Sequence, residues 1–370
     1  MENNKKHKSQ PFSLFPKAQR RMLYLLRKSA VQWGLFFALF TLIFTASVIV
    51  ILDMRTAEQH GYIDGCLENL DSGIGATVKN LEVFSRYVYE SSINKPDVTS
   101  LLFMAWKSGG AGRSVLRDRL YRMILPLYND LARYNFRQLH FHFPDCTSFL
   151  RMHSRDDYGD SLFDIRYTVR AVNETLKPSI AFEEGRIFNG YRFVYPVFDK
   201  GRHCGSVEVS FSMGSFVHVL HGLSGADILF AVKRSVTESV VFAHKLDNYT
   251  ESSFSPDYLF DVDVGSKNIS GFFYSMTDEH KEKLKRGEDF GYIQKNNNKQ
   301  LLVLFKSMRN IKNEHVAYLI HALPDSGYGS ITRHYNIILA TDVFISVLLL
   351  LLSGLLFADR RKLKRLSLTD

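Results

Sequence analysis

The sequence predicts an α+β protein in which two transmembrane helices flank a domain built from a long leading helix and two antiparallel sheets. Two long apolar runs lie near the ends of the 370-residue chain. A stripe of apolar residues at helical spacing follows the first run, and short alternating apolar and polar segments fill most of the chain between the runs. With 45% hydrophobic residues, the chain can form one or two proper cores.

The first apolar run extends from Trp33 to Leu52 and contains no charged residue. About 20 apolar helical residues cross a hydrocarbon layer of roughly 30 Å. We therefore predict transmembrane helices at residues 33–52 and 336–357. A cleaved signal peptide is the alternative for the first run, but the run exceeds the roughly 7–15 residues of a signal core. Asp342 in the second run is expected at the outer interface or at a polar contact between paired helices.

Basic residues flank the two runs on the sides that face the chain ends. Eight lysines and arginines stand between Lys5 and Lys28, and five between Arg360 and Arg365. By the positive-inside rule, both ends are cytoplasmic and the middle is outside, which in a bacterium means the periplasm. The predicted parts are a cytoplasmic segment at 1–32, an extracytoplasmic domain at 53–335 and a cytoplasmic tail at 358–370. The net charge of +9 therefore comes from basic residues that flank the membrane spans and face the lipid bilayer of the inner (cell) membrane. We expect no nucleic-acid partner.

A stalk helix is predicted directly after the first run. Its apolar residues recur at steps of three and four: Ile63, Leu67, Leu70, Ile74, Leu81, Phe84 and Val88, with Thr77 at one missing position. This stripe covers a sheet, joins a two-fold partner in a homodimer, or does both along different parts. A second helix is predicted at residues 114–135 with a kink at Pro126, after a glycine-rich loop at 109–112.

Two short strands joined by a turn at Pro144-Asp145 are predicted within residues 138–153. Successive side chains of a strand point to opposite faces, so Leu139 and Phe141 share one apolar face. The other face carries His140, His142, Arg151 and His153. A helix at 162–177 and strands at 179–183, 191–198 and 204–212 follow. In the last strand, Glu208 is expected to join the polar face.

Cysteine positions permit one disulfide outside the membrane. Cys146 and Cys204 could pair if their strands are antiparallel neighbours, while Cys66 is expected to be a free helix cysteine.

Residues 213–335 predict a second, smaller sheet. The expected helices lie at 216–223 and 277–286, and the strands at 227–233, 258–264, 290–293, 301–307 and 316–323. The extracytoplasmic domain then has a membrane-distal part at about 90–213 and a membrane-proximal part at about 214–327.

The polar face of the first sheet predicts a pocket for a small anionic or zwitterionic ligand. Arg151 offers a planar fork to a carboxylate, and protonated His153 strengthens that contact. Candidate partners of an ammonium group are Glu208, Glu183 and Asp160; Tyr191 and Tyr195 are candidate aromatic walls. The full predicted site is His140, His142, Arg151, His153, Asp160, Glu183, Tyr191, Arg192, Tyr195 and Glu208.

Two alternatives compete with this pocket. Arg151 and Asp160 could form a structural ion pair while the histidines are satisfied within the fold. His140, His142 and His153 could instead form a three-histidine metal site, although the prediction is no metal and no cofactor.

The same residues carry a resemblance to a known family. The segment LHFHFPDCTSFLRMHSRDDYGDSL, followed by Phe182–Arg186, Gly190–Pro196 and Gly205–Val209, resembles the double-Cache extracytoplasmic sensors of bacterial diguanylate cyclases, histidine kinases and chemoreceptors. The resemblance implies two PAS-like sheets behind a long helix and a signal receptor that binds a small molecule. Arg155 stands where the family pattern has proline, and Ala181 where it has glycine, so the ligand is not carried over.

The final residues, Leu366–Asp370, resemble the beginning of a GGDEF domain. This resemblance implies that the chain is the input half of a diguanylate cyclase, with a chemoreceptor or a sensor histidine kinase as the alternative. The chain as given is not expected to be an enzyme. A membrane-anchored extracytoplasmic enzyme is the alternative of another class, but the sequence has no nucleophile elbow and no HExxH motif.

Overall fold

A computed structural model describes residues 17–133, 136–185, 188–241, 243–265, 276–296 and 299–366. The basic segment before Lys17, Arg186 of the family pattern and the terminal residues 367–370 lie outside the described residues. The chain divides into two compact units: residues 1–59 with 330–370, and residues 60–329.

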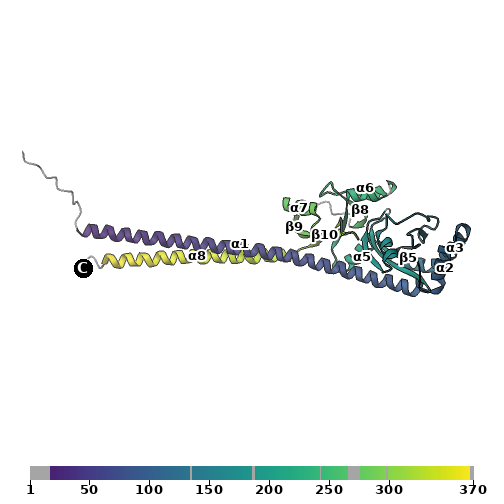
Figure 1. The fold of residues 1–370 in the computed structure, drawn as a ribbon. Helices are drawn as coiled ribbons and strands as arrows, with labels where there is room; N and C mark the ends of the chain where they lie inside the picture. The colour runs from purple at the N-terminus through teal and green to yellow at the C-terminus, as the bar shows by residue number, and fades with distance from the viewer. Residues whose placement is uncertain are drawn as a thin grey trace, which may run out of the picture. The chain divides into compact units, whose positions relative to one another are not determined.

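The first unit contains parts of two long helices, α1 (Lys17–Val88) and α8 (Gly327–Leu366). These parts lie side by side (Figure 1): the rings of Trp33 and Phe357 are 4.4 Å apart, and Gln59 Nε2 donates to Thr332 Oγ1 at 2.9 Å. Both helices are long and apolar enough to cross a membrane. Two candidate membrane helices therefore flank the second unit.

The second unit contains two antiparallel sheets, of which the first has five strands in the order β2-β1-β5-β4-β3. The strands are β1 (Phe136–His142), β2 (Ser148–Arg151), β3 (Ser179–Glu183), β4 (Gly190–Asp199) and β5 (Arg202–Ser212). Helix α4 (Tyr167–Thr175) follows β2, as predicted, but it is shorter than expected. Residues 152–166 form a loop, so residues 162–166, which were predicted to form the first turn of this helix, are not helical.

Helical segments cover the apolar face of this sheet. After α1 come a π-helical turn (Tyr89–Ile93), α2 (Pro96–Lys107) and α3 (Gly110–Ala132). The predicted stripe of α1 is confirmed in its centre, where Leu70, Ile74 and Thr77 are buried. The predicted glycine loop is wrong, because α3 already begins at Gly110.

The second sheet has six strands in the order β7-β8-β6-β11-β10-β9. Its strands are β6 (Asp227–Lys233), β7 (Tyr249–Glu251), β8 (Tyr258–Gly265), β9 (Phe290–Asn296), β10 (Lys299–Arg309) and β11 (His315–Pro324). The helices are α5 (Met213–Ser224), α6 (Arg234–Val240), a 3-10 segment (Ala243–Asn248) and α7 (Asp278–Arg286). The prediction that this sheet is smaller than the first is wrong, because it has six strands against five. The short β7 was not predicted from the sequence.

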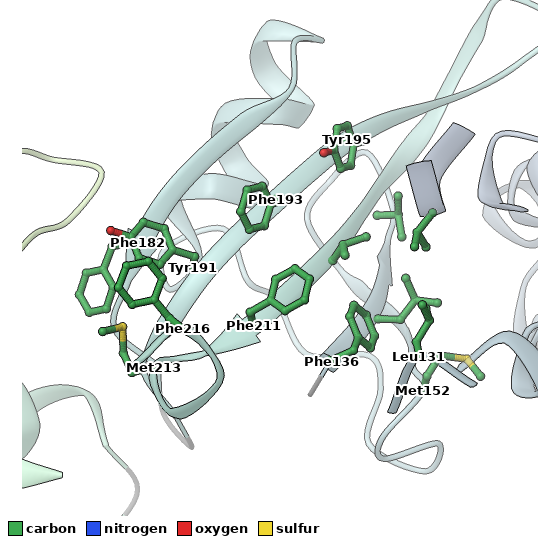
Figure 2. Packing of buried hydrophobic residues seen from close by; sticks show 14 of the residues in the cluster. Leu131, Phe136, Met152, Phe182, Tyr191, Phe193, Tyr195, Phe211, Met213 and Phe216 are labelled. Carbon is green, nitrogen blue, oxygen red and sulfur yellow. The ribbon is translucent and has the colours of Figure 1, made fainter. Parts of the chain in front are cut away.

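An aromatic cluster fills the space on the apolar face of the first sheet (Figure 2). Phe211 lies at its centre, with ring centroids 5.7 Å from Phe136 and 5.8 Å from Phe193 in edge-to-face geometry. Phe182 contacts Phe230 of β6 at 5.8 Å, so the core continues into the second sheet. Burying each such ring contributes about 1.5–3 kcal/mol relative to exposure.

The possible disulfide between Cys146 and Cys204 is absent, and Cys66 is free as well. Cys146 packs beneath α4 with Val169 and Val172, while Cys204 belongs to the core on the opposite face. The sheet therefore separates the two thiols.

We predict that His321 of β11 makes stability depend on pH. Its side chain is 5% exposed, and burial lowers its pKa to about 4. Between about pH 6.5 and 4 the unfolded chain binds a proton that the folded chain does not, so stability falls as pH falls. Relative to a His321→Asn variant, the wild type should lose about 2 kcal/mol of unfolding free energy between pH 7.5 and 5.

Chemical unfolding at the two pH values checks this expectation. His218→Asn, which changes an exposed histidine of α5, is the matched control. Equal pH dependence in the wild type and His321→Asn would contradict the assignment.

Candidate ligand-binding site

Polar side chains gather on the face of the first sheet that lies opposite the aromatic core. In the strand register, His140 of β1 stands beside Arg151 of β2 and Glu208 of β5. Arg192 of β4 stands beside Ser210. These positions all follow from strand alternation, because every second residue of β1, β4 and β5 points to this face.

Two histidines occupy the middle of the polar face. His140 and His142 are 2% and 0% exposed, and their ring centroids are 4.0 Å apart. His140 hydrogen-bonds Gln138 Nε2 through Nδ1 at 3.1 Å and Ser148 Oγ through Nε2 at 2.8 Å. His142 Nδ1 lies 3.2 Å from Ser206 Oγ, while its buried Nε2 has no hydrogen-bond partner among the described residues.

The histidines are neutral at physiological pH. Burial holds the pKa of His140 well below its usual range and lowers the pKa of His142 to about 3. Each ring thus keeps one nitrogen lone pair that can accept a hydrogen bond or bind a metal.

A buried ion pair joins β4 to β5 beside the histidines. Arg192 Nη1 donates to Glu208 Oε1 at 2.6 Å, and both side chains are 0% exposed. Burial alone would raise the pKa of Glu208, but the charges of Arg192 and Arg166 lower it to about 2. Glu208 is therefore ionised, and its Oε2 has no hydrogen-bond partner within the described part of the chain.

Arg192 also contacts Glu183 of β3, with Nε 3.3 Å from Oε2. The Glu183 carboxylate accepts from the backbone N–H of Tyr167 and from Thr168 Oγ1, each at 2.7 Å. Burial raises the pKa of Glu183 despite these contacts. The start of α4 is thereby tied to the polar face.

Arg166, directly before α4, adds a second cation to this cluster. Its Nη1 donates to the carbonyl oxygen of Glu184 at 3.0 Å. Among the residues that the structure describes, no carboxylate lies within 4.0 Å of its guanidinium. Burial and the nearby charge of Arg192 lower the pKa of Arg166 to about 10. The carboxylates of Glu183 and Glu208 oppose this shift from beyond salt-bridge distance.

Arg151 forms a two-pronged ion pair at the edge of the face. Its Nη1 and Nη2 donate to the two carboxylate oxygens of Asp160 at 2.9 and 2.8 Å, and Nη1 also donates to the carbonyl of Asp157 at 2.7 Å. The sequence alternative of an Arg151–Asp160 ion pair is therefore confirmed. Because Asp157 and Asp160 belong to the loop 152–166, Arg151 anchors that loop.

The structure brings most of the predicted site residues together. His140, His142, Arg151, Glu183, Arg192 and Glu208 share the polar face, and Asp160 joins them through Arg151. His153 follows the end of β2 and is exposed. Tyr191 and Tyr195 do not join the cluster, because they lie on the opposite face (Figure 2), beside Phe216 and Tyr89 respectively.

Sequence reasoning missed several members of the cluster. Gln138 shares strand parity with the histidines, so alternation alone could have found it. Arg166 and Thr168 come from the loop and helix after β2, and no pattern distinguishes Arg166 from Arg170, which pairs with Glu174 outside the cluster.

A cavity of about 350 Å³ lies between α3, β2 and the loop after β2. Its lining residues are Gly110, Arg113, Ser114, Arg117, Phe143, Thr147, Ser148, Phe149, Tyr158 and Gly159. None of the ten predicted site residues lines it, but Ser148 does, and Ser148 hydrogen-bonds His140. The polar face itself is packed beneath α4 and the loop 152–166.

Two antiparallel sheets behind a long helix are the layout that the double-Cache resemblance predicts. Residues 111–251 match the family model described as a double sensory domain of two-component sensor kinase. This match confirms the double-Cache resemblance over residues 111–251.

Solved structures with a similar fold include bacterial sensor domains. The ligand-binding domain of the Campylobacter jejuni chemoreceptor Tlp3, in complex with L-norvaline, has 10% identity and a TM-score of 0.38, covering 70% of this chain and 91% of that chain. The sensor domain of the V. cholerae histidine kinase DctB has 13% identity and a TM-score of 0.38, covering 74% and 99%. The comparison with curated proteins gives no significant match. With TM-scores below 0.5, the identification rests on the family match.

We predict that Arg192→Met destabilises the domain by about 3–5 kcal/mol, because it leaves the buried Glu208 and Glu183 carboxylates without their cation. Unfolding by denaturant measures the loss. Arg202→Met is the matched control: Arg202 is 59% exposed and pairs with Asp199, so its loss should cost less than about 1 kcal/mol. An Arg192→Met protein as stable as Arg202→Met would contradict the structural role of the pair.

Proposed function

We propose that the polar face of the first sheet binds a small anionic or zwitterionic metabolite through a carboxylate. The observation that carries this proposal is Arg166, a half-buried cation that donates to the carbonyl oxygen of Glu184 and has no carboxylate within 4.0 Å among the described residues. A guanidinium in that position is stabilised by an added anion, and its planar fork suits a carboxylate. The neutral His140 and His142 add hydrogen-bonding groups beside it.

Arg151 supplies the second contact in this proposal. In the structure it forms an ion pair with Asp160 of the loop 152–166. A ligand carboxylate would replace the Asp160 carboxylate on Arg151 and release the loop. Glu208, whose Oε2 has no hydrogen-bond partner among the described residues, is the candidate partner of an ammonium group of a zwitterionic ligand.

The signal would pass from this face to the second sheet and to the long helices. Arg166 donates to the backbone of Glu184, and the Glu184 side chain accepts at 2.9 Å from Nδ2 of Asn310, which lies in the turn between β10 and β11. Helix α1 runs without a break from the candidate membrane segment to the residues that cover the first sheet. A ligand that prefers one of two arrangements by about 1.4 kcal/mol changes the output tenfold.

We infer a two-pass receptor of the inner membrane, with residues 53–335 in the periplasm and both chain ends in the cytoplasm. The basic residues outside the two apolar runs support this topology. We also infer a homodimer that forms through α1. Val83 and Tyr87 of this helix are 60% and 68% exposed, as expected of residues that contact a second copy.

The output domain proposed for the whole protein is a diguanylate cyclase that follows Asp370. The Leu366–Asp370 segment supports this proposal. A chemoreceptor or histidine kinase output fits the sensory domain equally well.

For the ligand proposal, isothermal titration of the full chain in nanodiscs with amino acids and short dicarboxylates should reveal at least one ligand. Arg166→Gln and Arg151→Ala should each weaken its affinity about tenfold or more, because charged hydrogen bonds to the carboxylate are lost. Arg155→Gln is the matched control, since Arg155 lies in the same loop and pairs with Asp118 away from the cluster. Unchanged affinity in both Arg166→Gln and Arg151→Ala would refute the proposal.

For the output proposal, the coding sequence beyond the codon for Asp370 should encode a GGDEF motif. A histidine-kinase core, a chemoreceptor signalling helix or an immediate stop codon in its place would refute it.

A further inference from the structure

We propose that His140, His142 and Glu208 form a binding site for a divalent transition-metal ion such as Zn²⁺. The inference deepens the proposed function and rests on it in one respect, that the polar face is a binding site. It narrows the ligand to an anion that completes the coordination of the metal.

The three side chains already lie in position. The ligand atoms that they offer lie within 4.8 Å of one another, and all three residues are buried. Two ligand atoms of one zinc ion, each at about 2.0–2.2 Å, are separated by at most about 4.4 Å. Small side-chain rotations therefore suffice to close the site.

Two of the ligand atoms have no other role in the described structure. His142 Nε2 and Glu208 Oε2 are buried and lack hydrogen-bond partners among the described residues. Leaving a buried polar atom unpaired is unfavourable, so such atoms indicate a missing partner. A single cation between His142 and Glu208 satisfies both.

The surroundings match those of known metal ligands. His142 Nδ1 is held by Ser206 Oγ at 3.2 Å, and Glu208 Oε1 by Arg192 at 2.6 Å. Such contacts behind the ligands fix their geometry. His140 has both nitrogens hydrogen-bonded and would exchange one partner, Ser148 or Gln138, for the metal.

The ligand chemistry selects the class of ion. Two imidazoles and one carboxylate suit Zn²⁺, Co²⁺ or Ni²⁺, whereas Ca²⁺ and Mg²⁺ prefer oxygen ligands. Three protein ligands leave a position open on the ion. The bound metal adds positive charge beside Arg166, which increases the demand for an anion at that position.

Metal titration of the full chain, purified without a histidine tag, tests the inference. We expect one Zn²⁺ per chain by equilibrium dialysis and elemental analysis, with Ca²⁺ not bound at this site. His142→Gln should lower the Zn²⁺ affinity at least tenfold, while His218→Gln, which changes an exposed histidine, should leave it unchanged. Equal affinity in the wild type and His142→Gln would overturn the proposal.

A measurement on the wild type covers the case in which His142→Gln does not fold. Co²⁺ should give the visible absorption of a four- or five-coordinate ion with nitrogen ligands, and Zn²⁺ should displace it. A spectrum of octahedral aqueous Co²⁺ would overturn the inference.

The metal-site proposal and the carboxylate-ligand proposal can be tested separately. Arg151→Ala should lose carboxylate binding and retain Zn²⁺. Carboxylate binding that persists in chelator with unchanged affinity would refute the metal site and leave the proposed function standing. Stoichiometric Zn²⁺ uptake with no carboxylate ligand would support the metal site and refute the proposed function.

Discussion

The buried Arg192–Glu208 ion pair is the interaction on which the polar face depends. It joins β4 to β5 at 0% exposure, where an unpaired charge would be far more costly than on the surface. Arg192 also lies beside Glu183, whose carboxylate caps the backbone of Tyr167 at the start of α4. The pair therefore fixes one carboxylate oxygen of Glu208, helps to hold α4 in place and leaves Glu208 Oε2 without a hydrogen-bond partner among the described residues.

The two faces of the first sheet are stabilised by different kinds of interaction. On one, Phe211 and its aromatic neighbours provide apolar burial, which is non-directional and tolerates exchange of similar residues. On the other, few interactions are interchangeable, because each buried polar atom needs its own partner. The loop 152–166 on this polar side is held by several such contacts, among them the ion pairs Arg151–Asp160 and Arg155–Asp118.

Contacts between the two halves of the domain connect the second sheet to residues beside the polar cluster. Asn310 binds the Glu184 side chain, Tyr249 accepts from Asn189, and Phe182 packs on Phe230. Glu184 and Asn189 both lie in the segment between β3 and β4, beside Arg166 and Glu183. A change in the polar cluster therefore acts on residues that also touch the second sheet.

The sequence by itself determined the strands, their faces and the family. Alternation in β1 and β5 separated Leu139, Phe141 and Val207 from His140, His142 and Glu208, because a strand has a fixed period of two. The same rule, applied to β4, places Tyr191 and Tyr195 with the apolar residues. The apolar stripe of α1 was also predictable from the sequence, because its spacing follows from the geometry of a single helix.

Only the tertiary structure decided which charges meet. Glu208 lies beside His140 and Arg192 because β5 pairs with both β1 and β4, and strand order is not a local property of the sequence. Arg166 enters the cluster because the loop after β2 stays irregular where a helix was predicted, which brings its guanidinium under the sheet. Ion pairs and metal ligands depend on distances between segments far apart in the chain, and only folding sets those distances.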